Sequence, residues 1–123
     1  MKTLYITDLD GTLLHSDATL SEYEIAKIKE FHENDILFSV ATARSMITGG
    51  MLLKDIPLSA PAVLMNGVFV YDFESKQVIK YCKIDSVPYK RVLDAFDRHT
   101  LHPNVFSFDG EKLSIQCTGI DTD

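Results

Sequence analysis

The sequence of 123 residues is long enough for one ordinary domain with a single core. Apolar residues make up 46% and charged residues 24%, the balance of a globular protein, and the net charge of −6 argues against a nucleic-acid surface, which is normally basic. No apolar run approaches membrane-spanning length, and the first predicted strand follows Met1 too closely for a signal peptide. We therefore expect a cytoplasmic protein that binds neither nucleic acid nor a membrane.

A pair of carboxylates follows the first predicted strand. Residues 4–6 are apolar and predict that strand, and Asp8 and Asp10 come just after it. Gly11 and Thr12 then predict a tight turn. Because strand side chains alternate between faces, the two aspartates point the same way if the extended backbone continues that far. Neighbouring acids are tolerated mainly where a cation or a shared proton offsets their repulsion, so the segment indicates a catalytic site in which one acid attacks and the other moves a proton.

Two other interpretations of these aspartates are less favoured. An EF-hand loop that began at Asp8 would need glycine at its sixth position and an acid at its twelfth. Leu13 and Thr19 occupy those positions, so that interpretation fails. A plain turn, with Asp and Gly as ordinary turn residues, stays open, but the order of the segments that follow argues against it.

The next segments alternate between helix and strand. Ser21 and Glu24 have the spacing of a capping box, and apolar residues then recur at helical spacing, namely Ile25, Ile28 and Phe31. Residues 36–41 form a nearly continuous apolar run, which is typical of a strand covered on both faces. Strand, helix and strand in this order predict a βαβ unit, and hence an α/β fold with a parallel sheet. Residues 48–50 predict a break, followed by a short helix over 51–54.

Residues at the ends of the second and third strands add to the candidate site. Thr42 and Arg44 follow the second strand, and ligands of open parallel sheets bind at the carboxyl ends of strands. Alone, the threonine would more often be a helix cap and the arginine a solvated charge, but their place one strand after Asp8 favours a role in the site. Residues 62–65 predict a third buried strand. Asn66 follows it, either in a two-residue hairpin turn or, as we prefer, beside the site and before a hairpin over residues 68–72 and 77–84.

The chain changes character beyond residue 85. An apolar stripe predicts a helix, and residues 105–108 and 112–117 predict two strands around an Asp-Gly turn. His99 and His102 could share a helical face, but they lack further ligands at zinc spacing and are expected at the surface. Cys82 and Cys117 show no CxxC spacing, so we expect partly buried free thiols, with one disulfide as the alternative.

The segment from Asp8 to Leu14 resembles the first signature of the haloacid dehalogenase (HAD) superfamily of phosphohydrolases, in which two aspartates one residue apart precede Gly-Thr. The resemblance implies that Asp8 is the nucleophile that forms an aspartyl-phosphate and that Asp10 is the general acid/base. It also implies that Asp8 and the backbone carbonyl of Asp10 bind Mg²⁺, and that Gly11 and Thr12 help to bind the phosphate. A hard, oxygen-preferring cation would screen the substrate charge that otherwise repels a carboxylate.

The stretch from Thr42 to Arg44 resembles the second HAD signature, most closely in the Cof-type, sugar-phosphatase-like subgroup. By resemblance Thr42 bonds the phosphate through its hydroxyl, Arg44 contacts the substrate and Asn66 touches it. Ala43 stands where the subgroup commonly has glycine. The implied substrate is a small phosphorylated metabolite.

The resemblance also implies domain limits. Residues 1–84 would be a partial HAD core, a Rossmann-like parallel sheet of three strands plus a hairpin. Residues 85–123 would begin an α+β cap. The family's later lysine and acidic pair have no counterpart in the sequence, so we expect an amino-terminal portion with weak or no activity. Two alternatives are a degenerate, non-catalytic relative that binds phosphate or metal or serves in an assembly, and a phospho-acceptor signalling domain.

The same argument predicts a partner. Without the later strands of the family, residues 2–7 would form an exposed apolar sheet edge, which tends to pair with another chain. We therefore expect a homo-oligomer, or pairing with a missing carboxyl-terminal part.

Overall fold

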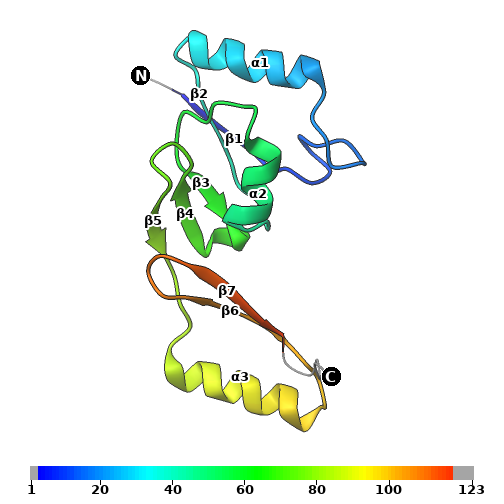
Figure 1. Ribbon diagram of the computed structural model, residues 1–123, viewed down its shortest axis with the longest axis vertical. Helices are drawn as coiled ribbons and strands as arrows, with labels where there is room; N and C mark the ends of the chain where they lie inside the picture. The colour runs from blue at the N-terminus through cyan, green and yellow to red at the C-terminus, as the bar shows by residue number, and fades with distance from the viewer. Residues whose placement is uncertain (1–2, 118–123) are drawn as a thin grey trace. The chain divides into compact units, whose positions relative to one another are not determined.

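The computed structural model describes residues 3–117 (Figure 1). The chain divides into two compact units, Met1–Lys83 and Ile84–Asp123, and the predicted division lies after residue 84. The described part mixes helices with strands, and the first two strands are parallel, which confirms the predicted α/β class. None of its helices has the length and hydrophobicity needed to span a bilayer.

A βαβ unit opens the first compact unit, as the sequence predicted. Strand β1 (Leu4–Thr7) pairs in parallel with β2 (Leu37–Val40), and helix α1 (Glu22–Glu33) connects them. The predicted capping box begins α1: the Glu24 N–H donates to the Ser21 hydroxyl, and the Ser21 N–H donates to the Glu24 carboxylate at 2.7 Å. The start of α1 is therefore fixed by local sequence.

Strand β2 is covered on both faces. Its consecutive residues Phe38, Ser39 and Val40 are all buried, which confirms the expectation from the continuous apolar run. The hydroxyl of Ser39 lies 3.0 Å from the carbonyl oxygen of Ala60 and 2.9 Å from that of Pro61. A buried hydroxyl needs such a partner, and this one ties β2 to the segment that leads into the third strand.

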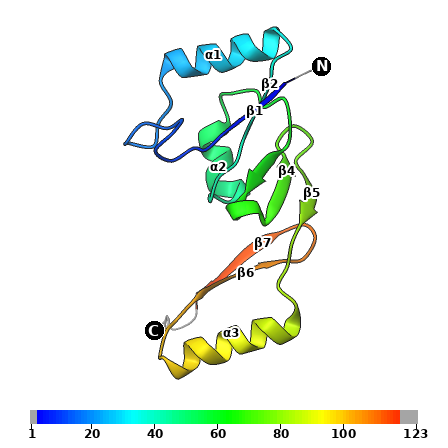
Figure 2. The ribbon, with the colours of Figure 1, turned by 180° about the vertical axis from the view of Figure 1, so that it is seen from behind.

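The prediction of a break at residues 48–50 was wrong. Helix α2 runs without interruption over Met46–Leu53 and begins with a second capping box, between Ser45 and Thr48. Both glycines lie in the helix because α2 packs closely on the sheet, beside β3 and β4 in Figure 2. A Cβ built on Gly49 would lie 3.9 Å from Leu64, and one built on Gly50 would lie only 3.1 Å from the ring of Phe73. Close approach of the backbone to Phe73 explains Gly50, whereas the space at Gly49 would accept a methyl group at an ordinary distance.

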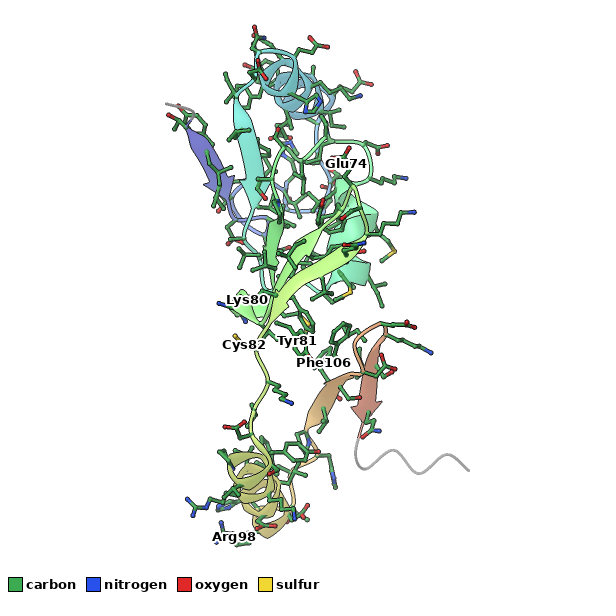
Figure 3. All side chains as sticks on the ribbon, turned by 90° about the vertical axis from the view of Figure 1, so that its left-hand side faces the viewer. Glu74, Lys80, Tyr81, Cys82, Arg98 and Phe106 are labelled. Carbon is green, nitrogen blue, oxygen red and sulfur yellow. The ribbon has the colours of Figure 1, made fainter. Side chains whose placement is uncertain are left out.

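A three-stranded meander follows. Strands β3 (Ala62–Leu64), β4 (Phe69–Asp72) and β5 (Gln77–Tyr81) pair antiparallel in that order, and one parallel bridge from Ala41 to Val63 joins β3 to β2. Because Leu64 pairs with Phe69, four residues connect β3 to β4, so the two-residue turn is excluded and the expected hairpin is confirmed. Lys80 and Tyr81, labelled in Figure 3, lie on opposite sides of the end of β5.

The second compact unit holds helix α3 (Ser86–Arg98) and a hairpin of β6 (Asn104–Phe108) and β7 (Leu113–Cys117). The predicted helix and hairpin are both present. The turn between the strands is longer than an Asp-Gly pair, because Phe108 pairs with Leu113 and residues 109–112 connect them. Within it the Asp109 carboxylate accepts from the Glu111 and Lys112 N–H groups. Cys82 and Cys117 are free, as expected, but both are exposed, so the expectation of partial burial was wrong.

Strand β1 has an open edge. Within the described residues it pairs with β2 alone. Its apolar side chains are 43% exposed at Leu4, 55% at Tyr5 and 53% at Ile6. The expected apolar edge is therefore present over residues 3–7, and Lys2 lies outside the described residues.

Candidate functional site

The loop after β1 presents both aspartates on one side. Leu9 is fully buried between them, whereas Asp8 and Asp10 are exposed, so the alternation expected from the strand continues through the motif. The Leu9 carbonyl accepts from the Leu13 and Leu14 N–H groups at 3.1 and 2.8 Å, which closes the loop. Gly11 has a left-handed φ of +74°, a conformation that favours glycine. The motif is thus a turn anchored by one leucine, with two carboxylates on its outer side.

Thr42 lies at the end of β2, beside that loop. Its side chain is buried, with 5% of its surface exposed, and its N–H donates to the Val63 carbonyl at 2.9 Å. The Thr42 hydroxyl oxygen accepts from the Arg44 N–H at 3.2 Å. Since the oxygen serves as acceptor, the hydroxyl hydrogen remains available to a ligand oxygen.

A strained turn brings Asn66 to the same place. Met65, Asn66 and Gly67 have consecutive left-handed φ angles of 50°, 54° and 92°, a costly conformation for the first two residues. Two hydrogen bonds hold the turn, from the Met65 N–H to the Arg44 carbonyl and from the Asn66 N–H to the Thr42 carbonyl. The turn is therefore fastened to the loop that carries Thr42, and Asn66 exposes its side chain at their junction.

These segments enclose one pocket with a volume of about 400 Å³. Volumes of about 300 Å³ or more are typical of small-molecule sites. Its walls come from the carboxyl ends of β1, β2 and β3, and its lining residues are Asp8, Asp10, Ala41, Thr42, Ala43, Val63, Asn66 and Gly67. The structure thus brings four predicted residues together, namely Asp8, Asp10, Thr42 and Asn66. Gly11 and Thr12 belong to the adjacent turn and do not line the pocket.

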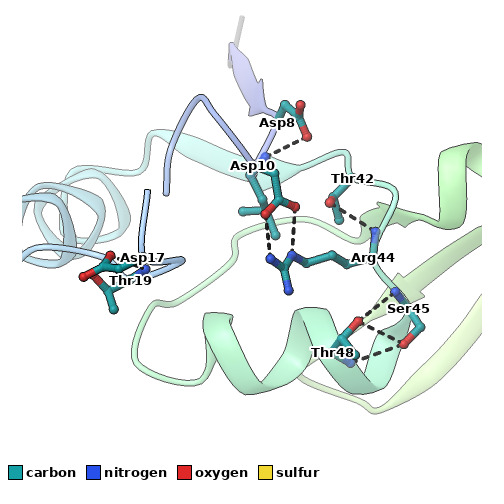
Figure 4. A network of polar contacts seen from close by, with 9 residues as sticks. Asp8, Asp10, Asp17, Thr19, Thr42, Arg44, Ser45 and Thr48 are labelled. Atoms are coloured by element: carbon teal, nitrogen blue, oxygen red, sulfur yellow. Dashed lines mark hydrogen bonds and ion pairs between the residues drawn. The ribbon is translucent and has the colours of Figure 1, made fainter. Parts of the chain in front are cut away.

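Arg44 makes a contact that sequence reasoning did not identify. Its Nε donates to Asp10 Oδ2 at 2.8 Å and its Nη2 donates to Asp10 Oδ1 at 2.6 Å, a two-pronged ion pair (Figure 4). This hydrogen bonding, with the nearby positive charge, lowers the pKa of Asp10, and the same pair raises the pKa of Arg44. The side chain of Arg44 is directed to Asp10, and Arg44 does not line the pocket.

Three further lining residues were also missed: Ala41, Val63 and Gly67. Ala41 and Val63 form the bridge between β2 and β3, and Gly67 belongs to the left-handed turn. Their signal in the sequence was position alone: Ala41 ends a predicted strand, Val63 lies within one and Gly67 comes shortly after it. Small apolar residues at such positions form pocket walls without any recognisable motif.

The two aspartates offer oxygen ligands of the type that Mg²⁺ prefers. One oxygen of Asp8 accepts from the Leu9 N–H at 2.7 Å, and its other oxygen has no partner among the described residues. Mg²⁺ in proteins usually takes one or two carboxylates and fills its remaining positions with water and phosphate. The Asp8 carboxylate and the backbone carbonyl of Asp10 therefore fit as part of a Mg²⁺ site, although residues 3–117 contain no group of three or more acidic, histidine or cysteine side chains able to hold a metal.

A family profile for haloacid dehalogenase-like hydrolases matches residues 5–116, nearly the whole chain. The chain belongs to the haloacid dehalogenase-like hydrolase family. The predicted resemblance to the HAD superfamily is thereby confirmed.

Individual relatives agree with this membership. Pyridoxal phosphate phosphatase YbhA of Escherichia coli is 25% identical over 95 residues, which cover 77% of this chain and 35% of the relative. The 5-amino-6-(5-phospho-D-ribitylamino)uracil phosphatase YitU of Bacillus subtilis is 28% identical over 102 residues, 80% of this chain and 37% of the relative. The chain of this HAD protein thus spans about a third of the length of these curated relatives.

A solved structure agrees on the fold. A structure described as a HAD/COF-like hydrolase from Plasmodium vivax superposes with a TM-score of 0.70 at 24% identity, over 91% of this chain and 42% of that one. The fold is therefore that of a part of a HAD protein.

Proposed function

We propose that this HAD chain is the amino-terminal portion of a Mg²⁺-dependent phosphohydrolase that cleaves small phosphate esters through an aspartyl-phosphate on Asp8. The single observation that carries the proposal is the convergence of Asp8, Asp10 and the buried Thr42 hydroxyl on one pocket. A nucleophile, a second acid and a hydroxyl donor within one small volume are what phosphoryl transfer to a carboxylate requires. The relatives named as phosphatases support it further.

Asp8, Asp10 and Thr42 each have a separate role in the proposed reaction. The Leu9 N–H holds one oxygen of Asp8, so the other oxygen can attack phosphorus, and the bond from phosphorus to the ester oxygen breaks. In its protonated form, Asp10 gives its proton to the departing ester oxygen and then, as a base, takes one from the water that hydrolyses the aspartyl-phosphate. The Thr42 hydroxyl donates to a phosphate oxygen. Mg²⁺, held by Asp8 and Asp10, would screen the charges that oppose the attack.

We further propose that the chain by itself has weak or no turnover. None of the residues that line the pocket is a lysine or an arginine, so no cation among them stabilises the transferring phosphoryl group. Losing one such preorganised donor typically costs about a hundred- to a thousandfold in rate. The alternative function, a non-catalytic relative that binds phosphate or metal or serves in an assembly, is favoured by the same observation.

Hydrolysis of p-nitrophenyl phosphate with and without Mg²⁺ tests the proposal. We expect any Mg²⁺-dependent turnover to disappear in Asp8→Asn and to persist in Asp55→Asn, which replaces an exposed aspartate that does not line the pocket. Equal turnover in Asp8→Asn and the unmodified chain would contradict the proposal.

A second readout covers the case of undetectable turnover. On addition of Mg²⁺ we expect the amide resonances of residues 8–10 to shift, and this shift to be lost in Asp8→Asn. Absence of both turnover and shift would contradict a Mg²⁺ site on this chain and would favour a non-catalytic relative that binds phosphate or serves in an assembly. A stable label acquired from a small phosphodonor without turnover would favour a phospho-acceptor domain instead.

The open edge of β1 supports a proposed partner, either a second copy of this chain or a separate carboxyl-terminal part. The backbone groups along an unpaired edge are a template for another strand, and Leu4, Tyr5 and Ile6 add exposed apolar surface. Light scattering coupled to size-exclusion chromatography should show an assembly larger than a monomer at micromolar concentration. A monomer that stays in solution would count against self-pairing. We also propose that the protein is located in the cytoplasm.

A further inference from the structure

The ion pair between Arg44 and Asp10 occupies the Asp10 carboxylate, which the proposed reaction uses as its proton donor. Both oxygens of Asp10 are engaged by the guanidinium, at 2.6 and 2.8 Å. The departing ester oxygen has to receive its proton from one of these oxygens. In Figure 4 the Arg44 side chain extends from the loop after β2 to the Asp10 carboxylate. Because the guanidinium favours the ionised carboxylate, whereas the departing ester oxygen needs the proton of a neutral Asp10, the observed pair is a resting arrangement.

The same edge of Arg44 suits phosphate. The Nε and Nη2 hydrogens form a planar fork that fits two oxygens of a carboxylate or of a phosphate equally well in geometry. One fork cannot serve both partners at once. Asp10 and a phosphate group in the pocket therefore compete for one guanidinium edge.

The surroundings allow an exchange without movement of the backbone. The Arg44 N–H donates to the Thr42 hydroxyl and the Arg44 carbonyl accepts from the Met65 N–H, so the main chain is held at both groups. The side chains of Arg44 and Asp10 are 28% and 53% exposed, so water can replace either partner as they separate. Exposed ion pairs contribute little to stability, and a phosphate ester carries more negative charge than a carboxylate. Rotation of the Arg44 side chain alone would suffice.

We propose that Arg44 locks Asp10 in the anion-free site and that a phosphate group releases Asp10 by taking over the guanidinium. This inference rests on the proposed function, because it assigns a regulation to the same site. Arg44 acts on the reaction in two successive ways: it withholds Asp10 until an anion is present, and it then binds that anion. The lock makes the availability of Asp10 depend on occupancy of the pocket.

Titration with inorganic phosphate, without Mg²⁺, tests the exchange in the full chain. The Nε–H resonance of Arg44 reports its partner directly and should shift on saturation with phosphate. When Arg44 is present, Asp10→Asn should raise the affinity for phosphate by about fivefold or more, because Asp10 no longer competes for the guanidinium. A factor of this size is typical of the coupling between two linked binding events. In the R44Q background the same change should raise the affinity by less than about twofold. Arg44→Lys keeps the charge but loses the fork, and should weaken phosphate binding.

The matched control is Asp8→Asn, which removes a carboxylate from the same pocket but none from Arg44. Its effect should be the same in the Arg44 and R44Q backgrounds, because it relieves only charge repulsion. Amide spectra of all variants check that the fold is retained.

Each adverse outcome has a distinct meaning. If phosphate binds but the Arg44 resonance does not shift, or if Asp10→Asn has the same effect in both backgrounds, the lock is wrong and the proposed function stands. If phosphate binds neither to the unmodified chain nor to Asp10→Asn, the lock is wrong and so is the anion-binding part of the proposed function.

Discussion

The two compact units differ in how they are stabilised. Among the described residues, the buried apolar side chains of the first unit include Leu9, Val40 and Leu64, each fully buried, and they surround the strands that end at the pocket. Among the described residues of the second unit, Leu113 is the single buried apolar residue, and no residue of α3 is buried. The pocket residues thus belong to the unit that has a core, which fits the requirement that functional groups be held by a rigid surrounding.

The helix starts show the same contrast. Helices α1 and α2 each begin with a complete capping box, whereas Asp85, at the start of α3, makes no side-chain capping bond. The reason is local. Pro88 occupies the third position of α3 and has no N–H for the Asp85 carboxylate to accept. In the first unit both packing and local sequence stabilise the helices, and in the second unit neither does so to the same degree.

The strongest test of this contrast is Leu64→Ala. The side chain is fully buried in β3, so its truncation should lower the free energy of unfolding by about 3 kcal/mol. The matched control, Ile79→Ala, truncates a side chain that is 57% exposed on β5 and should cost less than about 1 kcal/mol. Urea denaturation measures both. If Leu64→Ala unfolded the β6–β7 hairpin to the same extent as β2, the two units would not be independent and the contrast would fail.

Amide hydrogen exchange sharpens the contrast without mutation. We expect amides of β2 to be protected at least about tenfold more than those of α3, because opening of α3 exposes no buried side chain. The exchange of backbone amides, followed by NMR, gives both values in one sample. Equal protection in β2 and α3 would show that further contacts stabilise the second unit.

The caps offer a smaller effect. Ser21→Ala should cost about 1 kcal/mol, since it removes the side-chain cap of α1, while Asp85→Ala should cost only a few tenths. The hydrogen bonds from the Ser21 N–H and hydroxyl lower the pKa of Glu24. A lowered pKa in the folded state means that this contribution is complete above about pH 4.5 and is lost as the pH falls through the folded value. The cost of Ser21→Ala should therefore be smaller at pH 3 than at pH 7, and an equal cost at both would contradict the role of the carboxylate.

The two glycines of α2 give the smallest predicted effect. Gly49→Ala should stabilise by about 0.5–1 kcal/mol, because the new methyl group meets neighbours at an ordinary 3.9 Å and alanine favours the helix. Gly50→Ala should gain less or lose stability, because its methyl group would lie 3.1 Å from Phe73. Thermal melts of the two variants provide the comparison. A larger gain for Gly50→Ala would show that Phe73 moves easily.

Much of this arrangement follows from local sequence rules. The Ser21 cap, the buried run of β2 and the alternation about Leu9 each depend on a few neighbouring residues, and all three were predicted correctly. The position of Thr42 beside Asp8 followed from one topological rule, that parallel strands end at the same edge. These features needed no knowledge of distant contacts.

The errors involved partners far away in the sequence. The glycine pair indicates a helix break by propensity, and only the ring of Phe73 explains why the backbone must come close at that point. The contact of Arg44 with Asp10 joins two loops, and nothing in the local sequence of either shows that the side chain turns away from the pocket. Sequence rules thus predicted four residues that line the pocket but not the ion pair between Arg44 and Asp10.

The parallel pairing of β1 with β2 has a consequence for the order of folding. The hairpins β4–β5 and β6–β7 join residues that are close in the sequence, whereas the β1–β2 pair can form only after the chain has closed a loop that contains all of α1. Closing such a loop costs entropy before any contact repays it, so non-local parallel pairs form slowly. We expect Asp8 and Thr42, at the ends of these two strands, to meet late in folding. The pocket would then be among the last features to form, and its appearance would report that the sheet is complete.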